Sequence, residues 1–181
     1  MRLFRLLVAI ALLAAAGTGP AGAQVATAPE LKAAFLFNFV RFTTWPADAL
    51  PAGGPIAICV LGDRPVAQAL EDFTRDQHLD GHAIVVRRLR DQDAGRDCHL
   101  LYASDLRADR EARLIAQTRG AAVLTASDSA TFMQRGGIAA FHLAAGRMRF
   151  SVNPSAAKRA RLQVSSRLLG LAVIVDDDRR R

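Results

Sequence analysis

Residues 127–171 decide the fold, and they read SDSATFMQRGGIAAFHLAAGRMRFSVNPSAAKRARLQVSSRLLGL. Ser127–Asp128 predicts the start of a short helix, because serine and aspartate both favour helix N-termini. Gly136–Gly137 predicts its end, since glycine adopts the left-handed conformation that closes many helices. The rest of the stretch predicts a hairpin and a second helical segment. The stretch is therefore expected to form helix, hairpin and helix in succession.

The hairpin is predicted from two apolar runs, Ile138–Leu143 and Met148–Val152. Ala145–Gly146 separates them and favours a tight turn. Asn153–Pro154 then predicts a new helix start, because proline is common at the first helical position. That helical segment leads into Ser165–Leu169. The hairpin gives any sheet that contains it an antiparallel part.

Upstream of this stretch, strand-like and helical segments alternate. The strand-like segments are Pro55–Leu61, His82–Leu89, His99–Ala103 and Ala121–Thr125, and the helical ones are Pro65–Phe73 and a segment that Ser104–Asp105 caps and that runs to about Thr118. Such alternation is typical of an α/β fold around a parallel sheet. We therefore expect an α/β fold, a single compact domain with a mixed, partly parallel sheet flanked by helices.

The composition fits one folded domain. The chain has 181 residues, of which 51% are hydrophobic and 23% charged. Its net charge of +7 falls to +5 without Arg2 and Arg5, and to +2 without the basic tail Arg179–Arg181. The sequence lacks a basic helix interleaved with aromatic residues, so the charge does not indicate nucleic-acid binding.

The first 23 residues have the three parts of a secretory signal peptide. Arg2 and Arg5 give a positive start, Leu6–Ala16 is an apolar run, and Ala21–Ala23 is a small-x-small cleavage site. An N-terminal anchor is the alternative, but the run is short for a bilayer span of about 20 residues. We expect residues 1–23 to be removed, leaving a domain at 24–178 and a tail at 179–181.

The first helix of the mature chain is predicted at Glu30–Thr44, and Trp45–Pro46 is expected to end it. Leu31, Phe35, Phe39 and Phe42 follow helical spacing and predict a buried face. Further apolar residues make this face wider than an ordinary amphipathic stripe. A core helix is the simpler interpretation, and a dimer or partner surface is the alternative.

Cys59 and Cys98 are the only cysteines. An even number in an exported protein favours a disulfide. Cys59 lies inside the first buried strand and Cys98 just before the third, so neighbouring strands could bring them together. Two separate buried thiols are the alternative.

The sequence contains no recognisable catalytic or metal-binding constellation. His99 lies close to Ser104–Asp105, but these two residues already have the role of capping a helix. There is no GxSxG nucleophile elbow, no CxxC or HExxH motif, and the four histidines are scattered. We therefore expect no enzymatic activity, no cofactor and no metal.

Four motifs occur in a characteristic order: FVRFTTWP at Phe39–Pro46, ICVLGD at Ile58–Asp63, RFSVN at Arg149–Asn153 and SSRLLGLA at Ser165–Ala172. Together they resemble the YfiR family of periplasmic regulators, and the resemblance covers nearly all of Glu30–Val173. It implies a small α/β protein, often dimeric. The characterised type represses a membrane-bound diguanylate cyclase by binding its periplasmic part, which lowers cyclic-di-GMP inside the cell.

The resemblance also bears on the cysteines. Cys59 and Cys98 match a cysteine pair of the characterised type. A second pair found in that type has no counterpart here, so redox control through that pair is not implied. The partners implied are the periplasmic region of an inner-membrane diguanylate cyclase and a second copy in a homodimer. A periplasmic small-ligand-binding module that does not act on a cyclase is the alternative function.

The expected partner contacts are apolar side chains on the first helical unit and on the C-terminal unit. They are Phe39, Phe42, Trp45, Phe150, Val152, Leu168 and Leu169. An apolar centre with a polar rim is the usual anatomy of a protein interface. Burial of these side chains in the core is the alternative.

The signal peptide makes the first testable prediction. Protein recovered from the periplasm should have the mass of a chain that begins at Gln24, because cleavage is expected after Ala23. Intact-mass measurement checks this. A mature form that retains Met1–Ala23 would show that the segment is an anchor.

Overall fold

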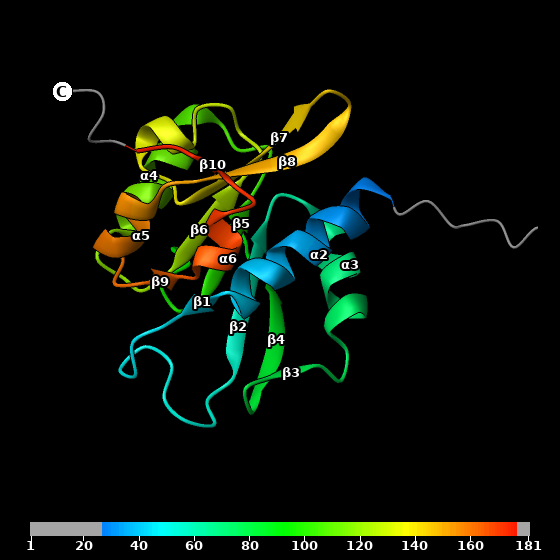
Figure 1. Cartoon of the computed structure of the whole chain (residues 1–181), viewed down its shortest axis with the longest axis vertical. Coiled ribbons are helices and arrows are strands. Elements are labelled where there is room, and N and C mark those ends of the chain that lie inside the picture. Colours follow the sequence, from blue (N-terminus) through cyan, green and yellow to red (C-terminus); the bar gives the residue numbers. More distant parts are fainter. Residues whose placement is uncertain (1–26, 177–181) are drawn as a thin grey trace, which may run out of the picture.

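The computed structural model describes residues 27–176, so the expected signal peptide and basic tail lie outside the described residues. Its main sheet has eight strands in the order β10-β8-β7-β6-β5-β2-β4-β3 (Figure 1). The strands are β2 (Ile56–Leu61), β3 (His78–Leu79), β4 (His82–Arg88), β5 (Leu100–Ala103), β6 (Leu124–Ser127), β7 (Ala139–Ala144), β8 (Arg147–Val152) and β10 (Val173–Ile174). Two short strands, β1 (Thr43–Thr44) and β9 (Gln163–Val164), form a separate antiparallel pair.

Five α-helices and one 3-10 turn accompany these strands. They are α2 (Ala28–Arg41), α3 (Arg64–Thr74), α4 (Ala108–Thr118), α5 (Pro154–Arg159), α6 (Ser166–Leu169) and the 3-10 turn η1 (Met133–Arg135). None of the helices in residues 27–176 combines the length and the apolar character that crossing a bilayer requires.

The sheet is mixed, as the sequence predicted. β4, β2, β5, β6 and β7 run parallel to one another, whereas β3 and β8 pair antiparallel with β4 and β7. At one edge β10 pairs parallel with β8. The expected α/β fold, a single domain with a partly parallel sheet, is therefore confirmed.

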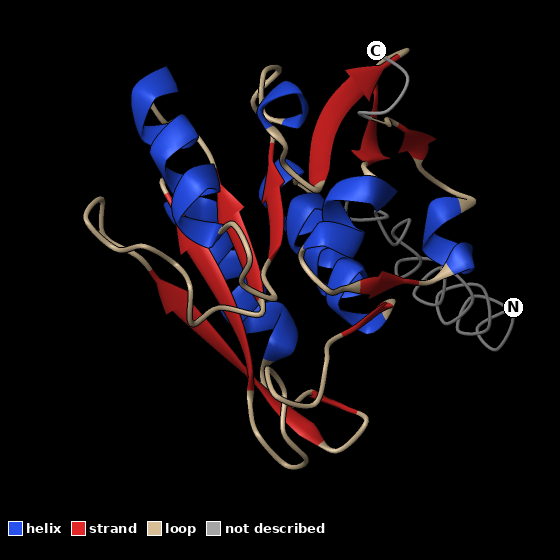
Figure 2. Cartoon of the chain, turned by 90° about the vertical axis from the view of Figure 1, so that its left-hand side faces the viewer, coloured by secondary structure: helices blue, strands red, loops and turns tan. Residues whose placement is uncertain are grey.

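Strand β2 lies inside the sheet, between β5 and β4, and is buried along its whole length. Because successive side chains of a strand point to opposite faces, β2 contributes to two separate hydrophobic clusters. Ile56, Ile58 and Val60 belong to the larger cluster, which includes side chains of α2 and α3. Cys59 and Leu61 belong to the smaller one, which includes a side chain of α4. Figure 2 shows helices on both faces of the sheet.

Helix α2 begins at a capping box, in which Thr27 and Glu30 each bond the other's backbone N–H group. It ends at Arg41, so the predicted extension to Thr44 is wrong. Strand pairing explains the difference, because Thr43–Thr44 bonds to β9 instead. Trp45 is buried after this strand, and its indole N–H donates to the carbonyl of His99 at 3.2 Å.

Two predicted helix caps are also wrong. Helix α4 begins after Arg107, and no side chain caps it, so Ser104–Asp105 does not have that role. Ser127 is the last residue of β6, and the stretch that follows forms only the 3-10 turn η1. Strand β6 itself begins three residues later than predicted, because the backbone of Ala121 still bonds to Thr118 in the turn after α4.

The hairpin and the next helix start are confirmed. β7 and β8 pair antiparallel, and Ala145 and Gly146 both have positive φ, as a tight two-residue hairpin turn requires. Asn153 caps α5, since its Oδ1 accepts from the N–H of Ala156 at 2.8 Å. The helical segment is interrupted, however, because β9 lies between α5 and α6.

The predicted disulfide is present between Cys59 in β2 and Cys98 just before β5, with the two Cα atoms 5.9 Å apart. Parallel pairing of β2 with β5 brings the two residues together. Both side chains are buried, so the bond lies within the smaller hydrophobic cluster.

Replacing both cysteines by alanine should lower the free energy of unfolding by about 4 kcal/mol. This value follows from the chain-entropy model, because the bond closes a loop between two cysteines that lie 39 residues apart in sequence. Denaturant unfolding of the double variant and the oxidised wild type measures the difference. Equal stability of the two proteins, or two free thiols by peptide mapping of the oxidised protein, would contradict this role.

Candidate functional site

Three polar residues follow three neighbouring parallel strands. Asp63, Ser104 and Asp128 lie just after the carboxyl ends of β2, β5 and β6. These ends meet at one edge of the sheet, which is where open α/β sheets usually bind ligands. The central part of the chain thus places two carboxylates and a hydroxyl close together.

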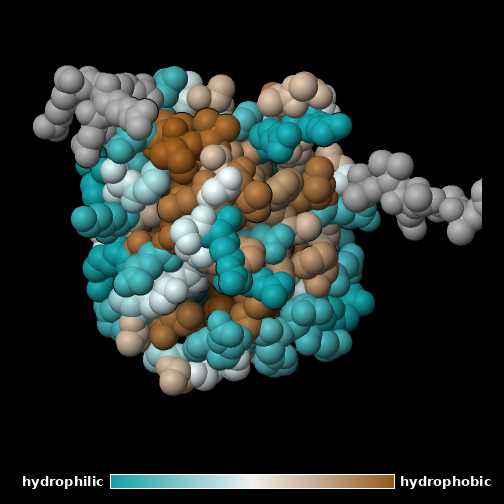
Figure 3. Space-filling view, viewed as in Figure 1, coloured by the Kyte–Doolittle hydropathy of each residue, from teal (hydrophilic) through white to brown (hydrophobic). Residues whose placement is uncertain are grey.

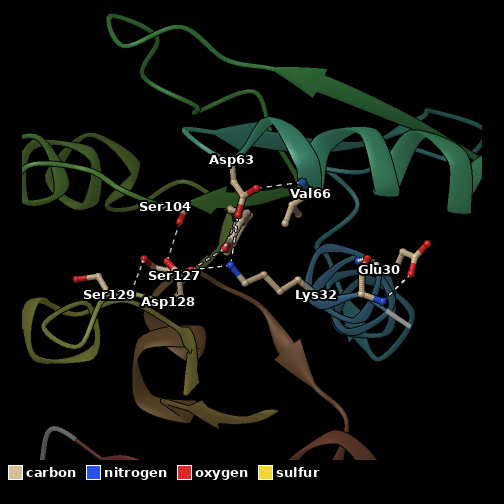
Figure 4. A network of polar contacts seen from close by, with 10 residues as sticks. Glu30, Lys32, Asp63, Val66, Ser104, Ser127, Asp128 and Ser129 are labelled. Atoms are coloured by element: carbon tan, nitrogen blue, oxygen red, sulfur yellow. Dashed lines mark hydrogen bonds and ion pairs between the residues drawn. The ribbon is translucent and has the colours of Figure 1, made fainter. Parts of the chain in front are cut away.

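Lys32 connects these strand ends to helix α2. Its Nζ donates to Asp128 Oδ2 at 2.7 Å and to Asp63 Oδ2 at 3.3 Å (Figure 4). Asp63 also caps α3, since its Oδ1 accepts from the N–H of Val66 at 3.0 Å. One ammonium group therefore joins α2 to the first residues after β2 and β6.

Two hydroxyl groups complete this arrangement, which we call the carboxylate cluster: Lys32, Asp63, Tyr102, Ser104 and Asp128. Ser104 Oγ donates to Asp128 Oδ1 at 2.9 Å. The Tyr102 hydroxyl lies 3.2 Å from Asp128 Oδ2 and 3.4 Å from Asp63 Oδ2. Lys32 also lies over the Tyr102 ring, 5.6 Å from its centroid. The cluster thus ties together α2, α3, β5 and β6.

The cluster keeps fixed charges near neutral pH. Burial favours the neutral form of Lys32, but its contacts with Asp128 and Tyr102 together outweigh this effect and raise the pKa of Lys32. Burial likewise opposes ionisation of Asp128, yet bonds from Lys32 and Ser104 lower its pKa. Burial raises the pKa of Tyr102 and keeps it neutral. Groups with such shifts do not exchange protons at neutral pH, so they suit electrostatic positioning rather than acid–base catalysis.

A cavity of about 610 Å³ adjoins the cluster. Lys32 and Asp128 line it together with Asp105, and Leu143 and Met148 form part of its apolar wall. It combines excess negative charge with apolar surface and has the volume of a small-molecule site. This geometry can accommodate a small molecule.

His99 does not form a catalytic group with Ser104 and Asp105. Its Nδ1 accepts from the N–H of Ala57 at 2.9 Å, so its Nε2 carries the proton and donates to the carbonyl of Ala49 at 3.1 Å. Burial lowers the pKa of His99 and favours this neutral form. Ser104 bonds to Asp128 instead. Within residues 27–176 there is no group of three or more His, Cys, Asp or Glu side chains able to hold a metal ion.

Most of the predicted partner contacts pack inside the domain. Phe39, Trp45, Phe150, Val152 and Leu168 are buried in the larger hydrophobic cluster. The Phe39 ring stacks on Phe141, with centroids 5.5 Å apart, and meets Phe150 edge to face. Phe42 and Leu169 are partly exposed at the margin of the same cluster. In this single chain, only these two of the seven candidates reach the surface.

Apolar surface lies instead further along the chain, at the edge strand. Leu171, Val173 and Ile174 expose 73%, 54% and 48% of their surface, and we call these three residues the C-terminal strip. Figure 3 shows apolar residues gathered over β10. Because β10 is the end strand of the sheet, one side of its backbone is left unpaired within residues 27–176. Exposed edge strands of this kind are ready templates for another chain.

The sequence did not reveal three features: the role of Asp128, the C-terminal strip and the role of Lys32. Asp128 was assigned to a helix cap, although an acidic residue directly after a buried strand also fits a strand-end site. The strip follows the predicted partner residues Leu168 and Leu169, and its run of apolar residues near the chain end was the available signal. Lys32 gave no local signal, since its partner Asp128 lies 96 residues away.

The fold, the disulfide and the exposed apolar edge define a small α/β domain with a surface suited to protein binding. Residues 29–173 match the model of the YfiR/HmsC-like family, and the chain belongs to this family. The family is regulatory rather than catalytic, and its members are periplasmic. The resemblance found in the sequence is therefore confirmed.

One solved structure supports the fold. A conserved domain protein from Vibrio cholerae O1 biovar El Tor is similar with a TM-score of 0.54 and 13% identity. The match covers 82% of this chain and 60% of that chain, so this protein spans well under two thirds of its relative. No curated protein matches the sequence. At this identity the likeness concerns the fold alone.

Replacing Asp128 by asparagine should lower the free energy of unfolding at pH 7 by about 1–3 kcal/mol, because Lys32 and Ser104 lose a charged acceptor. The pKa of Asp128 is depressed in the folded state, so its stabilisation is complete above the ordinary carboxyl pKa and is lost as pH falls through the folded value. Urea titrations at several pH values should therefore show wild type and variant converging in acid.

Asp109→Asn is the matched control, because Asp109 pairs with Arg113 on an exposed helix face. Its stability should stay close to that of the wild type. At about pH 2, well below ordinary carboxyl pKa values, the Asp128→Asn variant and the wild type should be closer in stability. If Asp128→Asn still lowers the free energy of unfolding there by the same amount as at pH 7, the charge of Asp128 is not the cause of the loss.

Proposed function

We propose that this protein is a periplasmic regulator that represses a membrane-bound diguanylate cyclase by binding its periplasmic region. On this proposal the chain is exported, residues 1–23 are removed, and repression lowers cyclic-di-GMP inside the cell. Membership of a family of periplasmic regulators supports the general role. The carboxylate cluster supports a role without catalysis, since Lys32 and Asp128 keep their charges near neutral pH.

The observation that carries the proposal is the C-terminal strip. Its three apolar side chains are about half exposed or more, and they lie on or beside an edge strand. A partner strand could pair with the open side of β10 while its side chains cover Val173 and Ile174. Phe42 and Leu169 lie partly exposed at the margin of the larger hydrophobic cluster. We assign the cyclase's periplasmic region to this surface, with a second copy of this chain as the competing occupant.

Repression across a membrane requires a preference for one state of the partner. A binder shifts the equilibrium of the cyclase only by the ratio of its affinities for the active and inactive states. A preformed edge strand suits this task because it accepts a partner segment only in an extended, accessible form. The regulator then stabilises the inactive state of the cyclase whenever that segment is presented.

One observation favours the alternative, a periplasmic small-ligand-binding module. The cavity of about 610 Å³ beside Lys32 and Asp128 lies at the sheet edge where α/β proteins usually bind ligands. This function needs no cyclase. It becomes the better account if loss of the protein leaves cyclic-di-GMP unchanged.

Deleting the gene should raise intracellular cyclic-di-GMP and biofilm formation, and the exported wild type should restore both. A Leu171→Glu/Val173→Glu variant should fail to restore them, because two charges on the strip should weaken partner binding by about tenfold or more. Mass spectrometric measurement of cyclic-di-GMP checks this outcome. A form lacking Met1–Ala23 should also fail, since it would not reach the periplasm.

Val85→Glu is the matched control, because Val85 is an exposed apolar side chain on β4, towards the other side of the sheet from β10. It should restore repression fully. Unchanged cyclic-di-GMP in the deletion strain, with every candidate cyclase expressed, would refute the repressor function. Full repression by the doubly charged variant would refute the strip as the docking surface. A change in oligomeric state without loss of repression would assign the strip to a homodimer.

A further inference from the structure

A second cavity, of about 390 Å³, lies at the amino ends of the parallel strands, whereas the carboxylate cluster lies at their carboxyl ends. Val123 and Ile138, which line it, come just before β6 and β7, so it sits at the amino ends of these strands. Residues from the C-terminal ends of α4 and α5 form further walls. Both helices lie together at the upper left of Figure 1.

The floor of this cavity is apolar. Ile115, Val123 and Ile138 line it and are themselves buried in the domain. Two glycines, Gly120 and Gly136, stand at its margin, and a Cβ added to either would meet no atom within 4 Å. The cavity is therefore open beside the glycines, and an apolar group could enter it without displacing a side chain.

Three arginines surround this apolar floor. Arg119 follows α4, Arg135 lies in η1 and Arg159 is the last residue of α5. Among the described residues that line the cavity there is no aspartate or glutamate. Arg135 is held in place, since its Nη1 donates to the carbonyl of Ala108 and lies 3.2 Å from Glu111 Oε1. The described lining thus contains three arginines and no acidic side chain, and Glu111, outside the lining, pairs with one of the three.

Helix ends offer a structural reason for part of this charge. Arginine near a helix C-terminus compensates the partial negative charge of the last carbonyls, worth about 0.3–1 kcal/mol per side chain. That effect explains Arg119 and Arg159, which lie at the ends of α4 and α5. Arg135 comes from a separate element, and its ion pair with the buried Glu111 fixes its position at the cavity.

We propose that this cavity binds a small organic anion, with a carboxylate on an aromatic or branched aliphatic body. The guanidinium group is planar and pairs with a carboxylate through two parallel hydrogen bonds. The body of the ligand would cover Ile115 and Ile138, and the volume lies within the range of small-molecule sites. The inference is independent of the proposed repression of a cyclase, because no residue of the C-terminal strip lines this cavity.

Titration calorimetry with 2-naphthoate tests the proposal directly on the purified protein. We expect saturable one-to-one binding with a dissociation constant below about 1 mM. Arg119→Gln/Arg159→Gln should weaken it by about tenfold or more, because two charged donors are lost. Ala160→Leu should weaken it as well, since Ala160 lines the cavity and a larger side chain would fill it without changing the charge.

Arg147→Gln/Arg149→Gln is the matched control, since it removes the same charge from the exposed hairpin. This control should bind 2-naphthoate as the wild type does, whereas acetate and inorganic phosphate, which lack the apolar body, should bind far more weakly. Three results would each overturn the proposal: no saturable binding of 2-naphthoate, equal weakening by the control variant, or binding of acetate or phosphate as tight as that of 2-naphthoate. Circular dichroism and an intact Cys59–Cys98 bond confirm that each variant is folded.

Discussion

The structure depends on the complete burial of strand β2. Its six residues face helices on both sides of the sheet and pair with β4 and β5 along both edges. Because such a strand has no exposed side, every residue must be apolar or, like Cys59, covalently bonded. The strand also positions Asp63, which comes two residues after its end and caps α3. The central strand thereby fixes the core, the disulfide and one member of the carboxylate cluster.

The sequence predicted the elements that local chemistry determines. The apolar run of β2, the turn at Ala145–Gly146 and the cap at Asn153 all depend on neighbouring residues, and all were predicted correctly. Ser104 and Asp128 were not, because serine and aspartate serve a helix cap and a distant hydrogen bond equally well. Only the packing of α2 against the sheet, which brings Lys32 to Asp128, decides between these roles.

The expected partner residues show the same limit of prediction from sequence. Phe39, Phe150 and Leu168 are apolar residues of the kind that build interfaces, but the single domain already uses them for its core. A pattern of apolar residues cannot distinguish a core position from an interface position, because both require apolar side chains that exclude water. The strip could be recognised only once β10 was seen at the end of the sheet, with its side chains uncovered.

The exposed turn that leads into the strip has a consequence for how the protein could be switched off. Exposed turns are preferred sites of proteolytic cutting, and Leu171 in the turn before β10 is 73% exposed. A cut after Gly170 would remove Leu171, Val173 and Ile174, yet leave the five parallel strands and the Cys59–Cys98 bond in place. The contact of Asp176 with Ser155, at 2.8 Å, holds the end of this segment against α5. Such a cut would therefore remove the docking surface that we propose, while the Cys59–Cys98 bond still links β2 to the start of β5.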